Sequence, residues 1–248
     1  MFIHSRASAD QRRWGWRHSL KPLMLHGGHA YEFGVFKGNS MRNINSIITP
    51  EIFWGFDSFE GLPNTLTERI HDWHKGAYRA DPRVELSRYY SNFRFIAGYY
   101  NNSLKDEIVN KYGMRPASYV DIDCDLYEST ITALDFMFRN KLISVGTIIG
   151  YDDFWAIPCG NQNVMPLDVG EGRAHLEISK KYLVDFECVN LACSDHWDHM
   201  KKNMGTWGAL FRVRSIGDTS NSGSNSTIKN LHTCKDIIRE KGLHFVKE

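Results

Sequence analysis

The sequence lacks any long apolar segment. No run in the 248 residues approaches the roughly 20 apolar residues of a membrane-spanning helix, and the first residues, MFIHSRASADQRRWGWR, lack the apolar segment of a signal peptide. A large charge of either sign is also missing, because the formal net charge is only +1. The sequence therefore gives no reason to expect a membrane or a nucleic acid as partner.

Paired cysteines are absent as well. The five cysteines are odd in number, scattered along the chain, and include no CxxC pair. They are Cys124, Cys159, Cys188, Cys193 and Cys234. This pattern argues against a disulfide framework or a zinc site and is typical of reduced thiols, so we expect a cytoplasmic protein.

What the chain does contain is an ordinary globular composition, with 42% hydrophobic and 24% charged residues. A chain of this length can bury one sizeable core and need not divide into two domains. We expect a helical extension at 1–28, one domain at 29–216, and a polar linker with a C-terminal tail at 217–248, where Gly and Ser are frequent.

Short β-rich segments alternate with longer helical ones. The expected strands are 30–36, 52–59, 92–100, 117–125, 146–154, 183–192 and 207–216. The expected helices are 39–48, 103–113, 127–142 and 170–182, with Gly113 closing the second of them. Alternation of apolar strands with helices predicts an α/β fold, in which helices cover both faces of a doubly wound, mostly parallel sheet.

Ligands of such sheets bind beyond the carboxyl ends of the strands. Gly34 and Gly38 follow the first expected strand, where they could let the backbone approach a ligand or simply form tight turns, and Asn39 or Ser40 could cap the next helix. The GxGxxG pattern of dinucleotide sites is missing. Asp57, 23 residues after Gly34 at the end of the second strand, is placed to bind the ribose of a nucleoside-bearing cofactor.

Aspartates gather at the ends of two further strands. Asp125 ends the fourth expected strand and Asp152–Asp153 the fifth, and a right-handed crossover brings both ends to the same crevice. Asp121 and Asp123 should point the same way as Asp125, since side chains alternate along a strand. Converging carboxylates repel one another unless a cation binds, and oxygen ligands favour Mg²⁺ or Mn²⁺. Helix capping is the alternative role of Asp125.

A candidate base lies in the segment ERIHDWHKGAYRAD (68–81), which follows the second strand and could cover the site. His71 and His74 are the leading candidates, because a free imidazole titrates near neutral pH. The alternative is that both histidines belong to a surface loop without a chemical role.

Four motifs together resemble those of class I S-adenosylmethionine-dependent methyltransferases, and most of all the macrocin/mycinamicin sugar O-methyltransferase family. The motifs are YEFGVFKGNS (31–40), GFDSFEGLP (55–63), DCDLYEST (123–130) and GTIIGYDDF (146–154). The resemblance covers about residues 29–182. It implies a Rossmann-like sheet of seven strands with an antiparallel last strand, S-adenosylmethionine as methyl donor, and an essential Mg²⁺.

The resemblance also implies roles for individual residues. The cofactor-binding set is Glu32, Gly34, Gly38, Ser40, Asp57, Ser58 and Asp123. The metal set is Asp125, Asp152 and Asp153, and the catalytic candidates are His71, His74 and Asp125. We expect a metal-dependent O-methyltransferase that acts on a hydroxyl of a small molecule, such as a sugar of a natural product, and that forms a homo-oligomer.

Three other functions stay open at this point. One is a methyltransferase of the same fold without a metal, in which a histidine is the sole base. Another is a nicotinamide-dependent oxidoreductase, which shares the sheet and the acidic end of the second strand. The last is a nucleoside-binding protein without catalytic activity.

Overall fold

The computed structural model describes residues 27–64, 73–154, 166–189 and 208–217, together with Leu20, Leu23 and Ile157. The expected extension at 1–28 and tail at 217–248 lie almost entirely outside these ranges, so the predicted domain boundaries stay predictions. No helix within the described ranges is both long enough and apolar enough to cross a membrane.

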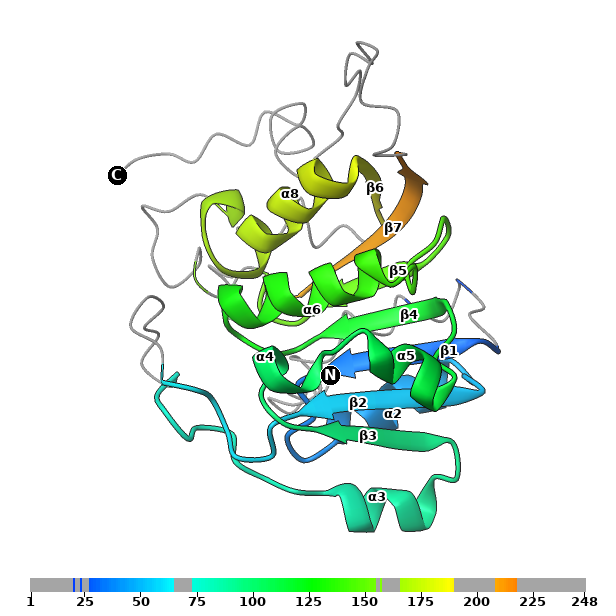
Figure 1. Cartoon of the computed structure of the whole chain (residues 1–248), viewed down its shortest axis with the longest axis vertical. Helices are drawn as coiled ribbons and strands as arrows, with labels where there is room; N and C mark the ends of the chain where they lie inside the picture. Colours follow the sequence, from blue (N-terminus) through cyan, green and yellow to red (C-terminus); the bar gives the residue numbers. More distant parts are fainter. Residues whose placement is uncertain are drawn as a thin grey trace, which may run out of the picture.

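The described residues form one seven-stranded sheet in the order β3-β2-β1-β4-β5-β7-β6 (Figure 1). The strands are β1 (His29–Phe33), β2 (Ile52–Asp57), β3 (Phe93–Ala97), β4 (Ala117–Ile122), β5 (Ile148–Tyr151), β6 (Val184–Cys188) and β7 (Ala209–Ile216). Neighbours from β3 to β5 pair in parallel, whereas β7 is antiparallel to both β5 and β6. The predicted Rossmann-like fold with an antiparallel last strand is confirmed.

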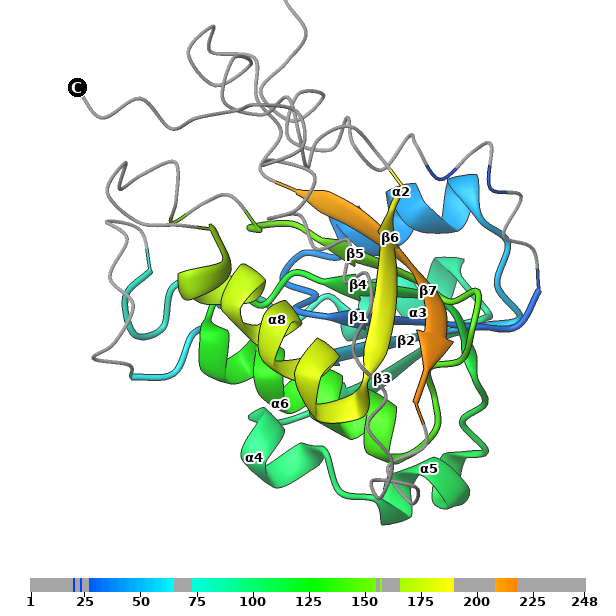
Figure 2. The same ribbon diagram turned by 90° about the horizontal axis from the view of Figure 1, so that it is seen from above.

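Helices cover both faces of this sheet. They are α2 (Asn39–Ile47), α3 (Arg83–Tyr89), α4 (Tyr100–Ser103), α5 (Glu107–Tyr112), α6 (Tyr127–Arg139) and α8 (Gly170–Tyr182). Helices α4, α5, α6 and α8 lie on one face and α2 on the other (Figures 1 and 2). Because both faces are covered, all five residues of the central strand β1 are buried.

Helix α6 illustrates how the sequence produces this packing. Thr130, Ala133, Leu134 and Met137 recur at helical spacing, and all four are buried. Such a stripe makes one side of a helix apolar, and burial of that stripe against the sheet holds the helix in place. On the opposite face, Leu86 of α3 belongs to a separate core cluster with residues of α2 and β2.

Some expected elements differ from the observed ones. The predicted helix 103–113 is divided into α4 and α5, because Leu104 leaves the helical conformation (ψ 68°) and is buried. Gly113 closes α5 with a positive φ of 63°, as predicted. Helix α3 was not expected, since Leu86 is its one buried side chain and gives no apolar periodicity.

The predicted strands 117–125 and 146–154 were too long. Strand β4 ends at Ile122 and β5 at Tyr151, so Asp123, Asp152 and the residues that follow lie in loops beyond the strand ends.

The order of the strands in the sheet reverses at β1. Strand β4 lies beside β1 on the side opposite to β2, although β2 follows β1 in the chain. This reversal is the topological switch point at which α/β sheets bind their ligands.

Candidate active site

A cavity of about 1020 Å³ opens at the switch point. Its walls come from the segments that follow four parallel strands: 34–40 after β1, 57–64 after β2, 99–102 after β3 and 123–132 after β4. Tyr78 completes the lining. Small-molecule sites in proteins usually measure about 300–1,000 Å³, so this cavity lies at the upper end of that range.

Gly34 fixes how the loops after β1 and β4 approach each other. It has a φ of +96°, and a Cβ atom placed on it would lie 1.8 Å from the carbonyl oxygen of Asp123. In addition, the Asp123 N–H donates to the Phe33 carbonyl at 2.8 Å. Only glycine allows this contact. The close approach predicted at Gly34 is therefore made by the protein backbone that carries Asp123.

The start of α2 differs from the expected capping. Gly38, with φ 70°, occupies the N-cap position and no side chain caps the helix, so the predicted capping by Asn39 or Ser40 is wrong. The Ser40 hydroxyl instead donates to Glu32 Oε1 at 2.6 Å, and Glu32 is fully buried. Ser40 lines the cavity whereas Glu32 does not. Glu32 thus orients Ser40 rather than facing the cavity itself.

Asp57 and Ser58 line the cavity at the end of β2. Oδ2 of Asp57 accepts the N–H groups of Val35 and Phe36 at 2.8 and 2.9 Å, and Oδ1 accepts that of Phe59 at 2.7 Å. These bonds join the loops after β1 and β2. A carboxylate has about four acceptor positions, so capacity remains for a ligand hydroxyl. The Ser58 hydroxyl donates to the Gly61 carbonyl at 3.0 Å.

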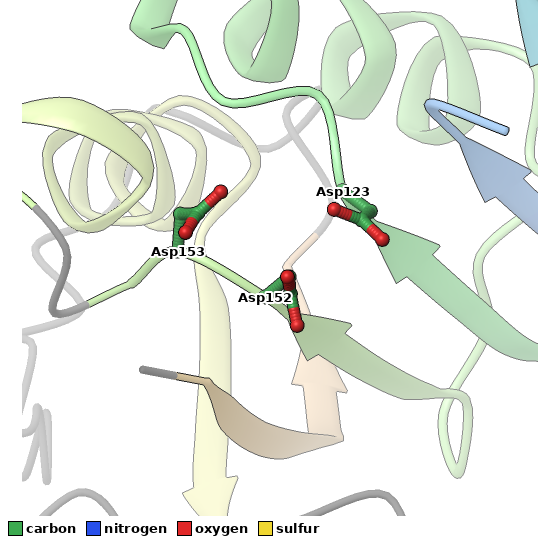
Figure 3. A group of neighbouring side chains, drawn as sticks. All are labelled: Asp123, Asp152 and Asp153. Atoms are coloured by element: carbon green, nitrogen blue, oxygen red, sulfur yellow. The ribbon is translucent and has the colours of Figure 1, made fainter. Parts of the chain in front are cut away.

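Three carboxyl groups meet just beyond the ends of β4 and β5 (Figure 3). Asp123, Asp152 and Asp153 each offer one oxygen, and these oxygens lie within 4.8 Å of one another. Asp152 is buried, and the other two are half-buried. Like charges at this separation destabilise the site unless a cation neutralises them. An all-oxygen set suits a hard divalent cation such as Mg²⁺ or Mn²⁺.

Asp125 is not part of this group, and Asp123 occupies the position that we predicted for it. A backbone hydrogen bond of 2.6 Å from Leu126 N–H to the Cys124 carbonyl forms a tight turn centred on Asp125, whose φ is +62°. Asp125 is buried and lines the cavity. The alternative that Asp125 is the N-cap of α6 is wrong, because Leu126 occupies that position.

Asp121 belongs to the interior of β4 rather than to the cavity. It is fully buried, accepts a hydrogen bond from the Tyr119 hydroxyl, and pairs with Gly150 across the parallel ladder to β5. Strand alternation therefore does not extend from Asp121 to Asp123 and Asp125, because the strand ends between them.

Sequence reasoning missed Glu171, in the first turn of α8. Its side chain is 1% exposed, and Oε2 accepts the Asp153 N–H at 3.0 Å. Burial, followed by the charges of Asp153, Asp152, Asp123 and Asp125, raises the pKa of Glu171 well above its usual value. Acidic residues are common in the first turn of a helix, where they interact with the helix dipole, so nothing in the sequence distinguishes this glutamate from an ordinary one.

Of the two histidines proposed as the base, the structure describes only His74. The His74 side chain is exposed and is not among the residues that line the cavity, whereas His71 lies outside the described residues. Their predicted role as base stays a prediction. His175, which was not predicted, is buried with Nδ1 3.0 Å from the Tyr151 hydroxyl, and burial lowers the pKa of His175 to about 3. It is a neutral core residue of α8.

Comparison with known proteins finds one family profile and several solved structures that this chain resembles. The family profile described as "Macrocin-O-methyltransferase (TylF)" matches residues 26–167, more than half of the chain. Among solved structures, the O-methyltransferase NovP is 19% identical, with 83% of this chain and 80% of that chain covered and a TM-score of 0.55. An O-methyltransferase from Bacillus cereus, in complex with SAH, is 13% identical over 86% and 84% of the chains, with a TM-score of 0.50. A search of curated protein sequences gave no significant match.

Proposed function

The chain belongs to the macrocin-O-methyltransferase (TylF) family and is an S-adenosylmethionine-dependent O-methyltransferase, and from this premise we propose that it methylates a sugar hydroxyl of a natural product with the help of a divalent cation. Family membership decides against a nicotinamide-dependent oxidoreductase and against a protein without catalytic activity. The observation that carries the proposed cation dependence is the separation of at most 4.8 Å among the oxygens of Asp123, Asp152 and Asp153.

S-adenosylmethionine, in this proposal, occupies the part of the cavity between the loops that follow β1 and β2. Gly34, Ser40, Asp57 and Ser58 line that part. The remaining acceptor capacity of Asp57 would bind the ribose hydroxyls, as expected for an acidic residue at the end of the second strand. Glu32 would act through its hydrogen bond with Ser40, and Gly38 through the turn that starts α2.

The divalent cation would be held by Asp123, Asp152 and Asp153. When bound, such an ion lowers the pKa of an alcohol and fixes the position of its oxygen. The three aspartates would thereby place the acceptor hydroxyl next to the donor, because Asp123 lines the same cavity as Asp57. Attack on the methyl group depends mostly on this alignment of the two substrates.

Asp125 is the base in this proposal. Its carboxylate is buried in the wall of the cavity, two residues after Asp123, and can accept the proton of the acceptor hydroxyl. His74 and His71 stay the alternative bases. They belong to the segment 68–81, which also contains Tyr78 of the cavity wall. Asp125→Asn separates the two possibilities, since it should abolish turnover without weakening cation binding.

The first experiment needs no acceptor. Binding of S-adenosylhomocysteine, measured by isothermal titration calorimetry, should be weakened in Ser40→Ala or Asp57→Asn and kept in Asp106→Asn, which changes an exposed aspartate that pairs with Arg139. Methyl transfer is then tested with a panel of nucleotide sugars and glycosylated natural products. The S-adenosylhomocysteine that each reaction releases is the quantity measured.

Activity with Mg²⁺ should disappear in EDTA and return when Mg²⁺ is added back. Asp153→Asn should be inactive, whereas the control Asp106→Asn should keep the wild-type rate. Full activity in EDTA would instead identify a metal-independent methyltransferase of the same fold, with the carboxylate cluster serving another purpose.

A further inference from the structure

Glu171 is a buried carboxyl group that the proposed reaction does not use. Its side chain is 1% exposed, and its Oε1 meets no hydrogen-bond donor among the residues that the structure describes. Buried polar atoms almost always have a partner, so an oxygen in this position points to a group that binds there. Interaction with the helix dipole does not explain why Glu171 is buried, because a first-turn glutamate gains that interaction while fully exposed to water.

The second oxygen of Glu171 connects α8 to the carboxylate cluster. Oε2 accepts the Asp153 N–H at 3.0 Å, which joins two residues 18 positions apart in the sequence. Asp153 lies in the loop after β5, and its neighbour Asp152 carries the buried member of the cluster. Through this bond Glu171 fixes the backbone on which two of the three clustered carboxylates depend.

Glu171 also adds a fourth acidic group to the same site. It touches the cluster through the Asp153 N–H, and the charges of Asp153, Asp152, Asp123 and Asp125 help to raise its pKa. It is not one of the residues whose oxygens share the 4.8 Å separation. Glu171 therefore lies outside the group that would contact a cation directly, in the position from which second-layer residues orient metal ligands.

We propose that Glu171 is a positioning residue of the divalent-cation site: one carboxylate oxygen holds the Asp153 backbone, and the other accepts a hydrogen bond from the hydration water of the cation. This inference rests on the cation site proposed above. Mg²⁺ and Mn²⁺ keep several waters when carboxylates bind them, and such waters need acceptors in a buried site.

The test uses Mn²⁺ as the probe and the full-length protein. Mn²⁺ affinity is measured by electron paramagnetic resonance titration, and the thermal midpoint is measured in EDTA and in saturating Mn²⁺. Glu171→Gln keeps the size of the side chain and an oxygen that can accept the Asp153 N–H, whereas Glu171→Ala removes both. Glu177→Gln is the matched control, because Glu177 lies on the same helix in an exposed ion pair with Arg173.

Loss of a second-layer partner typically weakens metal binding by about 10- to 100-fold. We expect Glu171→Gln to weaken Mn²⁺ binding by about tenfold and Glu171→Ala by up to about 100-fold, with Glu177→Gln unchanged. The thermal midpoint of Glu171→Gln in EDTA should be no lower than that of the wild type, because the amide can donate to the aspartates. Its increase on addition of Mn²⁺ should be smaller.

Two results would overturn the inference. Wild-type Mn²⁺ affinity in both Glu171 variants would leave the cation site intact and remove Glu171 from it. A thermal midpoint lowered equally with and without Mn²⁺ would reduce Glu171 to a structural residue. Failure of the wild-type protein to bind Mn²⁺ is a different outcome, since it would remove the cation site itself and the role of Glu171 with it.

Discussion

Gly34→Ala is the substitution whose effect can be worked out most fully. The added methyl group would lie 1.8 Å from the Asp123 carbonyl oxygen, whereas real Cβ contacts are essentially never shorter than 3.0 Å, so one of the two loops must move by about 1.2 Å. Overpacking of this kind costs about 1–3 kcal/mol, and a positive φ in a non-glycine residue costs about 1–2 kcal/mol. We expect the free energy of unfolding to fall by about 2–5 kcal/mol.

The same displacement should affect the site. Asp123 is carried by one of these two loops, and the oxygen ligands of Mg²⁺ lie at about 2.0–2.1 Å with little tolerance. A shift of about 1.2 Å is therefore enough to take Asp123 out of the group of three carboxylates. We expect Gly34→Ala to lose Mn²⁺ binding even where the protein remains folded.

Gly146→Ala is the matched control for this prediction. Gly146 has a φ of +94°, close to the +96° of Gly34, but a Cβ atom on it would meet no heavy atom of the described residues within 4 Å. Its amide is also hydrogen-bonded, to the Val213 carbonyl at 2.8 Å. The control should therefore lose only the about 1–2 kcal/mol that comes from backbone strain.

The unfolding free energy of both variants is measured by urea unfolding, and their Mn²⁺ affinity by titration. A chain of this size changes its thermal midpoint by about 2–4 °C per kcal/mol, so the difference between the variants is measurable in a thermal scan as well. Equal stability and equal Mn²⁺ affinity of Gly34→Ala and Gly146→Ala would refute the reasoning, because they would mean that the contact between Gly34 and Asp123 has no consequence.

Three further predictions concern the core and the donor site. The pKa of His175 is lower in the folded protein (about 3) than the ordinary 6.5, so the unfolded chain binds more protons as the pH falls and the stabilisation present above pH 6.5 is lost toward pH 3. Between pH 7.5 and 5.0 urea unfolding should show a loss of about 2 kcal/mol that is absent in His175→Phe. Ser40→Ala removes a donor to the buried Glu32 and should lower the unfolding free energy by about 1–3 kcal/mol, whereas unchanged stability would make that hydrogen bond unimportant. Asp57→Asn replaces one of two oxygens that accept backbone N–H groups, so it should weaken S-adenosylhomocysteine binding at least tenfold in calorimetry, and wild-type affinity would remove Asp57 from the donor site.

The general position of the site could be predicted from the sequence. The helix predicted at 170–182 has the observed bounds of α8, and the strand order places the acidic ends of β4 and β5 side by side, as a right-handed crossover requires. Gly34 and Asp57 also line the cavity that was expected from their spacing. These features follow from apolar periodicity and from the rules that connect parallel strands.

The choice between neighbouring aspartates could not be made from the sequence. Asp123 and Asp125 belong to the same short acidic motif, and the tight turn centred on Asp125 is what separates Asp125 from the carboxylate cluster. That turn depends on where β4 stops pairing with β1, which is a property of the assembled sheet. Glu171 was missed for a similar reason, because its burial depends on how α8 packs against the loop after β5.

The most direct test is a crystal structure of the protein with S-adenosylhomocysteine and Mn²⁺, with the ion located by its anomalous scattering. A single Mn²⁺ peak should lie beside the cofactor in contact with carboxylate oxygens of Asp123, Asp152 and Asp153, at bond lengths of about 2.0–2.3 Å. No peak at this position, or a peak bound by other residues while these three carboxylates point apart, would contradict the cation-dependent mechanism.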